Sequence, residues 1–359
     1  MKIALLSYST KPRGGVVHTL ALAEALAALG ADVTVWSLGR GGDARFFRPV
    51  DPAVQVRIVP FPDGPPQETV GERILRSITV LRDAFDPTPY NIVHAQDCIS
   101  ANAVDGRCVR TVHHLDHFTT PELAACHERA IVEPYAHLCV SRSVADELAA
   151  GWGIKAEVIP NGVAYERFAQ TDPAARDAWR ARLGGYVLTV GGIEPRKGSL
   201  DLLEAYALLH AARPDVRLVI AGGETLFDYH DYRARWESRA VELGIEPVVL
   251  GPVPDDELPA LVAAADAFAF PSLKEGFGLA AMEALAAGVP LVVRDLPVLR
   301  EVFGPAARFA ATPEDLTDQL GQALTHHDPA RQTAGRELAA SHTWSEAAQR
   351  HLDFYLSLS

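Results

Sequence analysis

The stretch that decides the fold is AFAFPSLKEGFGLAAMEALAAGVPLVVRD, residues 267–295. A short apolar run enters a loop containing Pro and Gly, a helix follows from about Leu279, and a second apolar run ends the stretch. Strands that are apolar along their whole length are typical of a parallel sheet covered on both faces. The stretch therefore predicts a βαβ unit whose loop lies at the C-terminal end of the first strand.

The same alternation extends through the rest of the chain. GYVLTVGG, VRLVIAGG and PVVLGPV are expected strands in the second half, and each is followed by a helical pattern. In the first half, KIALLSY and ADVTVWSL flank a helix at 17–29. The polar stretch from AEVIPNGV through YERFAQTDPAARDA resembles a linker. We therefore expect an α/β protein with two facing, Rossmann-like doubly wound domains.

The composition is that of an ordinary globular protein. The chain has 359 residues, of which 48% are hydrophobic and 22% charged, and its formal net charge is −13. This acidic balance argues against nonspecific nucleic-acid binding, which needs clustered Lys and Arg. No apolar run approaches the roughly 20 residues that cross a bilayer, and the first residues predict a strand rather than a signal peptide. Four widely spaced cysteines indicate reduced thiols, so we expect a cytoplasmic protein.

Two carboxylates flank the junction of loop and helix in the opening stretch. Glu275 lies in the loop, and Glu283 lies about one turn inside the helix. The amides of Phe277, Gly278 and Leu279 form an anion site there, because a helix start carries unpaired N–H groups and a positive dipole end. Carboxylates that accept hydroxyl hydrogen bonds beside amides that hold phosphate suit a sugar nucleotide. Without its context, such a pair of glutamates is more often one helix-start residue and one solvated residue.

Two further segments carry groups suited to phosphate. In VGGIEPRKG, residues 190–198, Arg196 and Lys197 follow a strand and can clamp a diphosphate, although a solvated basic turn would look the same. Gly14 and Gly15 open a helix and let the backbone approach a phosphate closely. A full G-x-G-x-x-G is absent, which disfavours a nicotinamide dehydrogenase.

Histidines gather in TVHHLDHF, residues 111–118. The metallo-hydrolase pattern H-x-H-x-D-H fails here, and the chain has no D-x-D pair, so we predict that no metal is used. His113 ends a strand and either meets a ligand or only orders its loop. His18 and His94 can equally line a site or pack in a core.

These segments together resemble the retaining glycosyltransferase family 4 of the GT-B fold. The two glutamates with seven residues between them match its signature, and NIVHAQ, VSRSVADEL, VIPNGV and the terminal TW…Y helix fit as well. The resemblance implies a C-terminal helix that crosses back to the first domain. It thus implies an acceptor-side domain of residues 1–162 plus 344–359 and a nucleotide-sugar-binding domain of residues 163–343. Acceptor loops are implied at about 60–72 and 113–121.

The resemblance also implies residue roles on the donor. Glu283 corresponds to the carboxylate that binds the nucleotide ribose, and Glu275 to the one near the sugar hydroxyls. His113 corresponds to a residue that faces the donor sugar. The backbone of Gly251–Val253, including Val253, corresponds to the segment that contacts the base.

The phosphate groups of the donor are assigned in the same way. Lys197 matches the family lysine, and the Gly15 amide matches a contact to the donor phosphate or sugar. The family carries an arginine where this chain has Gly192, so Arg196 would have to replace it.

We therefore predict a retaining hexosyltransferase of the EC 2.4 type, with a nucleotide-diphosphate sugar as co-substrate and no other cofactor. The acceptor, a small molecule, glycan or lipid, is not readable from the sequence, nor are the donor base and sugar or the oligomeric state. A sugar-nucleotide epimerase and a non-catalytic sugar-nucleotide binding module remain alternatives. The basic helix at 71–85 is compatible with membrane contact, although an ordinary surface helix is the favoured interpretation.

Overall fold

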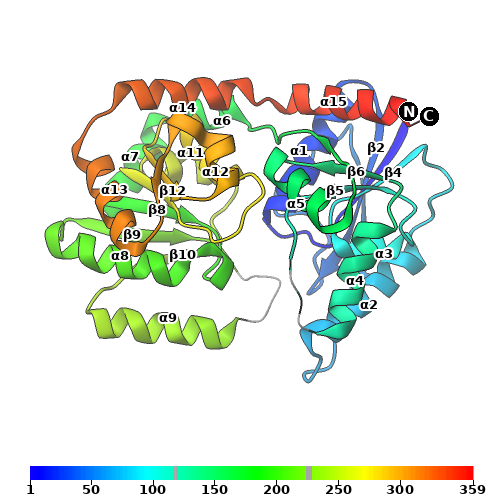
Figure 1. Cartoon of the computed structure of the whole chain (residues 1–359), viewed down its shortest axis with the longest axis horizontal. Helices are drawn as coiled ribbons and strands as arrows, with labels where there is room; N and C mark the ends of the chain where they lie inside the picture. Colours follow the sequence, from blue (N-terminus) through cyan, green and yellow to red (C-terminus); the bar gives the residue numbers. More distant parts are fainter. Residues whose placement is uncertain (117, 119, 224–228, 359) are drawn as a thin grey trace. The chain divides into compact units, whose positions relative to one another are not determined.

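The computed structural model describes residues 1–116, 118, 120–223 and 229–358, and the chain forms two compact units. Unit 1 contains Met1–Gly162 and the segment from Trp344 on, and unit 2 is Val163–Thr343. Each unit is a parallel sheet with helices on both faces (Figure 1). The predicted class, two Rossmann-like α/β domains, is confirmed.

Unit 1 has a seven-stranded sheet in the order β3-β2-β1-β4-β5-β6-β7. The strand order reverses between β1 and β4, and sheets of this kind bind ligands at the loops that follow the two strands at such a reversal. The strands are β1 (Lys2–Leu6), β2 (Asp32–Arg40), β3 (Gln55–Phe61), β4 (Ile92–Ala95), β5 (Val109–Val112), β6 (Ala136–Cys139) and β7 (Glu157–Val158). The helices are α1 (Gly14–Ala28), α2 (Val70–Ala84), α3 (Cys98–Ala103), α4 (Pro121–Val132), α5 (Arg142–Trp152) and α15 (Trp344–Ser357).

The helix α15 belongs to the core of unit 1 although it comes last in the sequence. It packs beside α1 (Figure 1), and Ala347, Ala348 and Tyr355 join the same buried cluster as Leu20 and Leu26 of α1. The Tyr355 side chain is completely buried. Unit 1 is therefore completed by residues that lie beyond unit 2 in the chain.

Unit 2 has a six-stranded sheet in the order β10-β9-β8-β11-β12-β13, which reverses between β8 and β11. Figure 1 shows α8 and α9 on one side of this sheet and α11 and α14 on the other. The strands are β8 (Gly185–Val190), β9 (Val216–Ala221), β10 (Val248–Gly251), β11 (Ala267–Phe270), β12 (Leu291–Arg294) and β13 (Arg308–Ala310). The helices are α6 (Tyr165–Ala169), α7 (Pro173–Leu183), α8 (Ser199–Ala212), α9 (His230–Leu243), α10 (Leu258–Ala263), α11 (Leu279–Ala286), α12 (Pro297–Phe303), α13 (Pro313–Thr325) and α14 (Pro329–Ser341), with 3₁₀ turns η1 (Pro195–Lys197) and η2 (Gly304–Ala306).

The expected linker in the middle of the chain contains the boundary between the two units, at Gly162 and Val163, but it is too long. Its second half forms α6 and most of α7, and Phe168 and Trp179 bury their side chains in unit 2. Asp172 accepts a hydrogen bond from the Ala174 amide and caps α7, and Pro173 occupies the first turn. Proline at that position supports a helix start, because its missing N–H would have no partner there anyway.

The basic helix expected at 71–85 is α2, and its arginines face the protein as much as the solvent. Arg76 pairs with Glu68 at 2.6 Å, and Arg82 pairs with Asp105 at 2.9 Å. These contacts favour the interpretation of α2 as a surface helix of unit 1. Within the described ranges, no helix combines the length and the apolar character that a bilayer crossing requires.

Candidate active site

The loops after β8 and β11 bring Lys197 and Glu275 together in unit 2. These strands are neighbours at the point where the sheet order reverses, so their C-terminal loops meet. Gly198 makes the approach possible: its φ is +63°, and a Cβ there would lie 2.2 Å from the Pro271 carbonyl oxygen. The Leu273 amide also donates to the Arg196 carbonyl at 2.8 Å and ties the two loops together.

Four charged side chains form one ion-paired set at this junction. Lys197 Nζ lies 2.5 Å from Glu275 Oε1, and Arg196 Nη1 lies 3.1 Å from the same oxygen. Arg196 Nη2 lies 3.0 Å from Glu194 Oε1. Two cations thus meet two carboxylates, and both carboxylate side chains are only 11% exposed. Glu194 is not among the site residues predicted from the sequence, because its only signal is its place three residues before Lys197.

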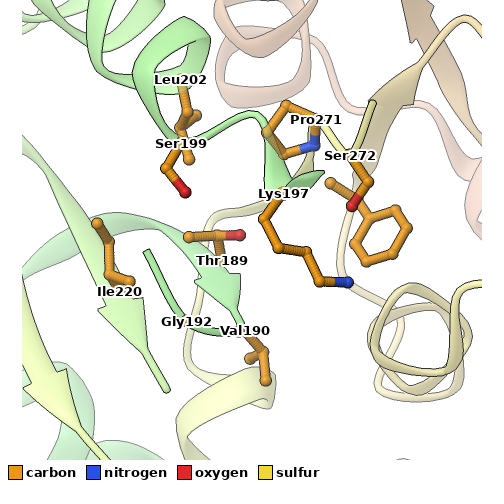
Figure 2. A pocket seen from close by; sticks show the side chains of 11 residues that line it. Thr189, Val190, Gly192, Lys197, Ser199, Leu202, Ile220, Pro271 and Ser272 are labelled. Atoms are coloured by element: carbon orange, nitrogen blue, oxygen red, sulfur yellow. The ribbon is translucent and has the colours of Figure 1, made fainter. Parts of the chain in front are cut away.

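The Lys197 side chain reaches into a small hollow lined by Gly192, Thr189 and Ser272 (Figure 2). Burial lowers the pKa of Lys197, and the neighbouring Glu275 carboxylate opposes that shift. Ser272 is 1% exposed, and its Oγ has no hydrogen-bond partner within the described part of the chain. The position where the family carries an arginine therefore lies beside Lys197, whereas the Arg196 guanidinium is held by Glu194 and Glu275.

The start of α11 has a backbone that only glycine fits. Gly278 has a φ of +96°, and a Cβ there would lie 3.1 Å from Phe303 and 3.2 Å from Phe270. Phe277 is 3% exposed, so it anchors the turn in the interior. The amides of the first turn, which begins at Leu279, have no partner inside the helix and carry its positive dipole end.

Glu283 lies further along α11 in different surroundings. Burial raises its pKa from the ordinary 4.5 to about 7, and the charge of Asp255 adds to the shift while Arg167 opposes it. Arg167 and Asp255 are themselves 2.8 Å apart. Val253 stands two residues before Asp255 in the loop after β10, so the segment expected to contact a base leads to the environment of Glu283.

In unit 1, His113 lies beside the glycine turn that opens α1. A Cβ on Gly15 would be 3.8 Å from His113 Cδ2, whereas a Cβ on Gly14 would meet nothing within 4 Å. His113 Nε2 is buried and makes no hydrogen bond with any described residue. Burial, followed by the charges of His18 and Arg110, lowers the pKa of His113 well below 6.5, so its imidazole is neutral at pH 7.

His18 and His94 are packed in the interior of unit 1. The His18 ring stands edge-on to His113 at 4.8 Å, and His18 Nδ1 lies 2.9 Å from Asn161 Oδ1. His94 is fully buried between the hydroxyls of Tyr355 and Thr111, each 2.7 Å away.

The histidine-rich segment 111–118 carries side chains of the types that bind metal ions. Among the residues that the structure describes, no three His, Cys, Asp or Glu side chains converge in a way that could hold a metal ion. His114 instead pairs with Asp116 at 3.3 Å, and His117 lies outside the described residues. Metal independence stays a prediction.

Two parallel-sheet α/β units are the architecture of the GT-B fold, and comparison with known proteins agrees. The family model described as "Glycosyl transferases group 1" matches residues 181–336, and "Glycosyltransferase Family 4" matches residues 12–167. The chain therefore belongs to the family of group 1 glycosyltransferases.

Three similar proteins illustrate the relationship. The chain is 36% identical to an O-antigen chain mannosyltransferase B of Escherichia coli, over 48% of this chain and 42% of that relative. It is 30% identical to a D-inositol 3-phosphate glycosyltransferase of Nocardia farcinica, over 99% of this chain and 89% of that relative. A sucrose-phosphate synthase structure from Thermosynechococcus elongatus has the same fold, with a TM-score of 0.80, 20% identity, and coverage of 99% of this chain and 98% of that one.

Proposed function

We propose that this protein is a metal-independent, retaining hexosyltransferase that takes its sugar from a nucleoside-diphosphate donor. The observation that carries the proposal is the Lys197–Glu275 pair, set at the C-terminal ends of β8 and β11 and followed by the start of α11. An ammonium group and helix-start amides suit a diphosphate, and a carboxylate suits sugar hydroxyls. Retention and the freedom from metal rest on the family resemblance.

The chemistry asks the protein mainly to stabilise a leaving anion. The bond between the anomeric carbon and the phosphate oxygen breaks, and its electron pair leaves with the diphosphate. Lys197 and the α11 amides stabilise that charge as it grows, and Arg196 supports them through Glu275. The acceptor hydroxyl forms the new bond to the anomeric carbon, and its proton passes to an oxygen of the departing diphosphate.

The remaining predicted roles fit the local chemistry. A neutral His113 with an unsatisfied Nε2 suits a hydrogen bond to a sugar hydroxyl. Glu283 suits the two ribose hydroxyls, and Val253 lies in the loop that we assign to the base. Gly15 leaves room for a phosphate or sugar at the start of α1. Relatives named for mannosyl transfer and for glycosylation of D-inositol 3-phosphate make hexoses and polyol or glycan acceptors the first candidates.

A ligand screen with Lys197→Ala tests the proposal. Thermal unfolding is measured with nucleoside diphosphates and their hexose conjugates, and a matching ligand at a hundredfold excess over its Kd adds about 2.7 kcal/mol. Lys197→Ala should abolish most of that gain and lower transfer about 10²–10³-fold. Lys155→Ala, an exposed site in unit 1, serves as the control and should change neither.

Two results would overturn the proposal. One is a wild-type protein that no such ligand stabilises, and the other is full transfer by Lys197→Ala. Nuclear magnetic resonance of the sugar nucleotide alone identifies an epimerase, because its sugar would change configuration without an acceptor. The anomeric coupling constant of the transfer product decides whether configuration is retained.

A further inference from the structure

A cluster of arginines surrounds Tyr8 in unit 1, where β1 and β2 end. The guanidinium of Arg13 lies 5.6 Å from the Tyr8 ring centroid, and Arg13 Nη1 donates to Tyr8 Oη at 3.2 Å. The guanidinium of Arg40 lies 5.7 Å from the same ring and 5.4 Å from the Phe61 ring. Arg13 directly precedes α1, and Arg40 is the last residue of β2. These two cations therefore share one aromatic side chain.

Arg73 of α2 adds a third positive charge. The pKa of Arg40 is lowered from 12.5 to about 10, mainly by burial and also by the charges of Arg73 and Arg13, while Tyr8 and Asp97 act in the opposite direction. Like charges that are held together in a half-buried place repel each other, so this arrangement lowers the stability of the fold.

Arg13 and Arg40 lack the carboxylate partners that nearby cations have. Within the described residues, neither forms an ion pair with Asp or Glu, and the Nε of each is buried without a hydrogen bond. By contrast, Arg76 of α2 pairs with Glu68 at 2.6 Å. The Asp97 carboxylate, which faces this cluster, already accepts hydrogen bonds from the Tyr8 and Ser100 amides.

A buried glutamine next to Asp97 in the chain is also unsatisfied. Gln96 directly precedes Asp97, and its amide donates to the carbonyl of Leu6 at the end of β1. The side chain is 2% exposed, yet neither of its polar atoms has a hydrogen-bond partner in the described part of the chain. Unsatisfied buried polar groups cost about 1–3 kcal/mol each, so their concentration here indicates a ligand that completes them.

The unmet groups fit one kind of ligand. Guanidinium groups match phosphate with two parallel hydrogen bonds. A chain with a net charge of −13 would not attract phosphates over its general surface, so a local positive cluster marks a specific place.

We infer that Arg13, Arg40 and Arg73 bind a phosphate group of the acceptor, which makes the acceptor a phosphorylated polyol or sugar, free or as a lipid headgroup. The word acceptor rests on the proposed function. The donor diphosphate has its own partners in Lys197 and the start of α11, so this phosphate is a second, separate anion.

The test measures binding of phosphate probes to the full chain by titration calorimetry. The probes are inorganic phosphate and glycerol 3-phosphate with glycerol as the uncharged match, and phosphatidylcholine vesicles with and without phosphatidylglycerol. Arg13→Gln and Arg40→Gln should each weaken phosphate binding at least tenfold. Arg57→Gln, on the exposed side of β3 in the same unit, should leave it unchanged. Preference for glycerol 3-phosphate identifies a free acceptor, and preference for the charged vesicles identifies a headgroup.

Three results overturn the inference: no probe binds, Arg40→Gln binds phosphate as the wild type does, or Lys197→Ala removes the phosphate binding instead. Arg40→Lys keeps the positive charge but loses the two parallel donors of the guanidinium group, so it should show an intermediate loss of phosphate binding. This variant covers the case in which Arg40→Gln unfolds. Nucleoside-diphosphate binding that survives without phosphate binding defeats only this inference. Phosphate binding without any nucleoside-diphosphate binding defeats only the proposed function.

Discussion

The two units use basic side chains in opposite ways. In unit 2, Lys197 and Arg196 are neutralised where they stand by Glu275 and Glu194. In unit 1, Arg13 and Arg40 remain without carboxylate partners in the described chain. A balanced set can exchange partners as charge moves during a reaction, whereas an unbalanced set is suited to hold an anion that keeps its charge throughout. We therefore propose that the same Rossmann-like scaffold serves as a reacting site in unit 2 and as a docking site in unit 1.

The glycines at the helix starts of unit 1 and unit 2 differ as well. Gly278 before α11 and Gly198 before α8 have positive φ and touch neighbours that leave no space for a side chain. Gly14 has an open surrounding, and Gly15 only an ordinary contact with His113. Unit 2 therefore fixes its turns sterically, while unit 1 keeps space at the start of α1.

Glu275→Gln should convert the balanced set of unit 2 into an unbalanced one. Loss of one negative charge beside Lys197 should tighten nucleoside-diphosphate binding about tenfold, since an opposing charge is removed. Transfer should fall about 10²–10³-fold. The neutral amide cannot pair with Lys197 and Arg196, or accept hydrogen bonds from the sugar hydroxyls, as the carboxylate does. Calorimetry and initial rates measure the two effects. Glu194→Gln is the matched control, with a smaller change in both; a parallel loss of binding and transfer in Glu275→Gln would contradict the expectation.

Gly278→Ala should destabilise the protein by about 2–3 kcal/mol. The substitution forces a left-handed backbone onto alanine and pushes its Cβ against Phe303 and Phe270. Gly14→Ala, the counterpart in unit 1, should change stability by less than about 0.5 kcal/mol, since its Cβ meets open space. Denaturant unfolding of both variants measures the difference. Equal stabilities would show that the two turns are not sterically distinct.

Glu283→Gln should stabilise the protein increasingly as the pH rises from 4.5 to 7 and fully above pH 7. The pKa of Glu283 is about 7 in the fold against an ordinary 4.5, so below pH 4.5 the group is protonated in both states and has no effect. As the pH rises from 4.5 to 7, the unfolded state ionises first and stability is lost. The variant removes this loss, which we set at about 1–2 kcal/mol above pH 7 for a half-buried carboxyl.

The buried histidines His18 and His351 of unit 1 make stability depend on pH in the opposite direction. The pKa values of His18 and His351 are lowered to about 3 and 4, so unit 1 keeps its stability above pH 6.5 and loses it as the pH falls toward those values. Hydrogen exchange followed by mass spectrometry measures the stability of each unit separately.

For the Glu283→Gln variant, Glu246→Gln, an exposed site of unit 2, is the control. A Glu283→Gln gain that is constant from pH 4 to 8 would contradict the assignment.

The sequence revealed the fold where patterns were local. Apolar runs such as LVIAGG, each followed by a helical period, were enough to predict parallel sheets, and the EGFGL loop was enough to predict a helix start with glycine. The segment of α6 and α7 was misjudged, because its surface is polar and it has few buried apolar side chains, namely Phe168, Trp179 and Leu183. Residue type and spacing do not reveal which polar helix packs on a sheet.

Long-range contacts escaped the sequence for a physical reason. Glu194 became part of the site only through Arg196, and the arginine cluster gathers residues from the ends of β1 and β2 and from α2. His94 could be judged a packing residue only after Tyr355, 261 positions away, was seen to contact it. Such contacts between residues far apart in the chain follow from the order of the strands in the sheet, and a single sequence does not reveal that order. The roles of the predicted site residues stay predictions.

The placement of α15 has a consequence for how the protein matures on the ribosome. Unit 1 lacks one wall of its core until Trp344 and the residues after it emerge, and by then all of unit 2 has been synthesised. At about 5–20 residues per second, the nascent first half waits on the order of ten seconds or longer with the α1 surface uncovered. Unit 2 is thus free to finish first, and a chaperone that shields α1 in the meantime would raise the yield of native enzyme.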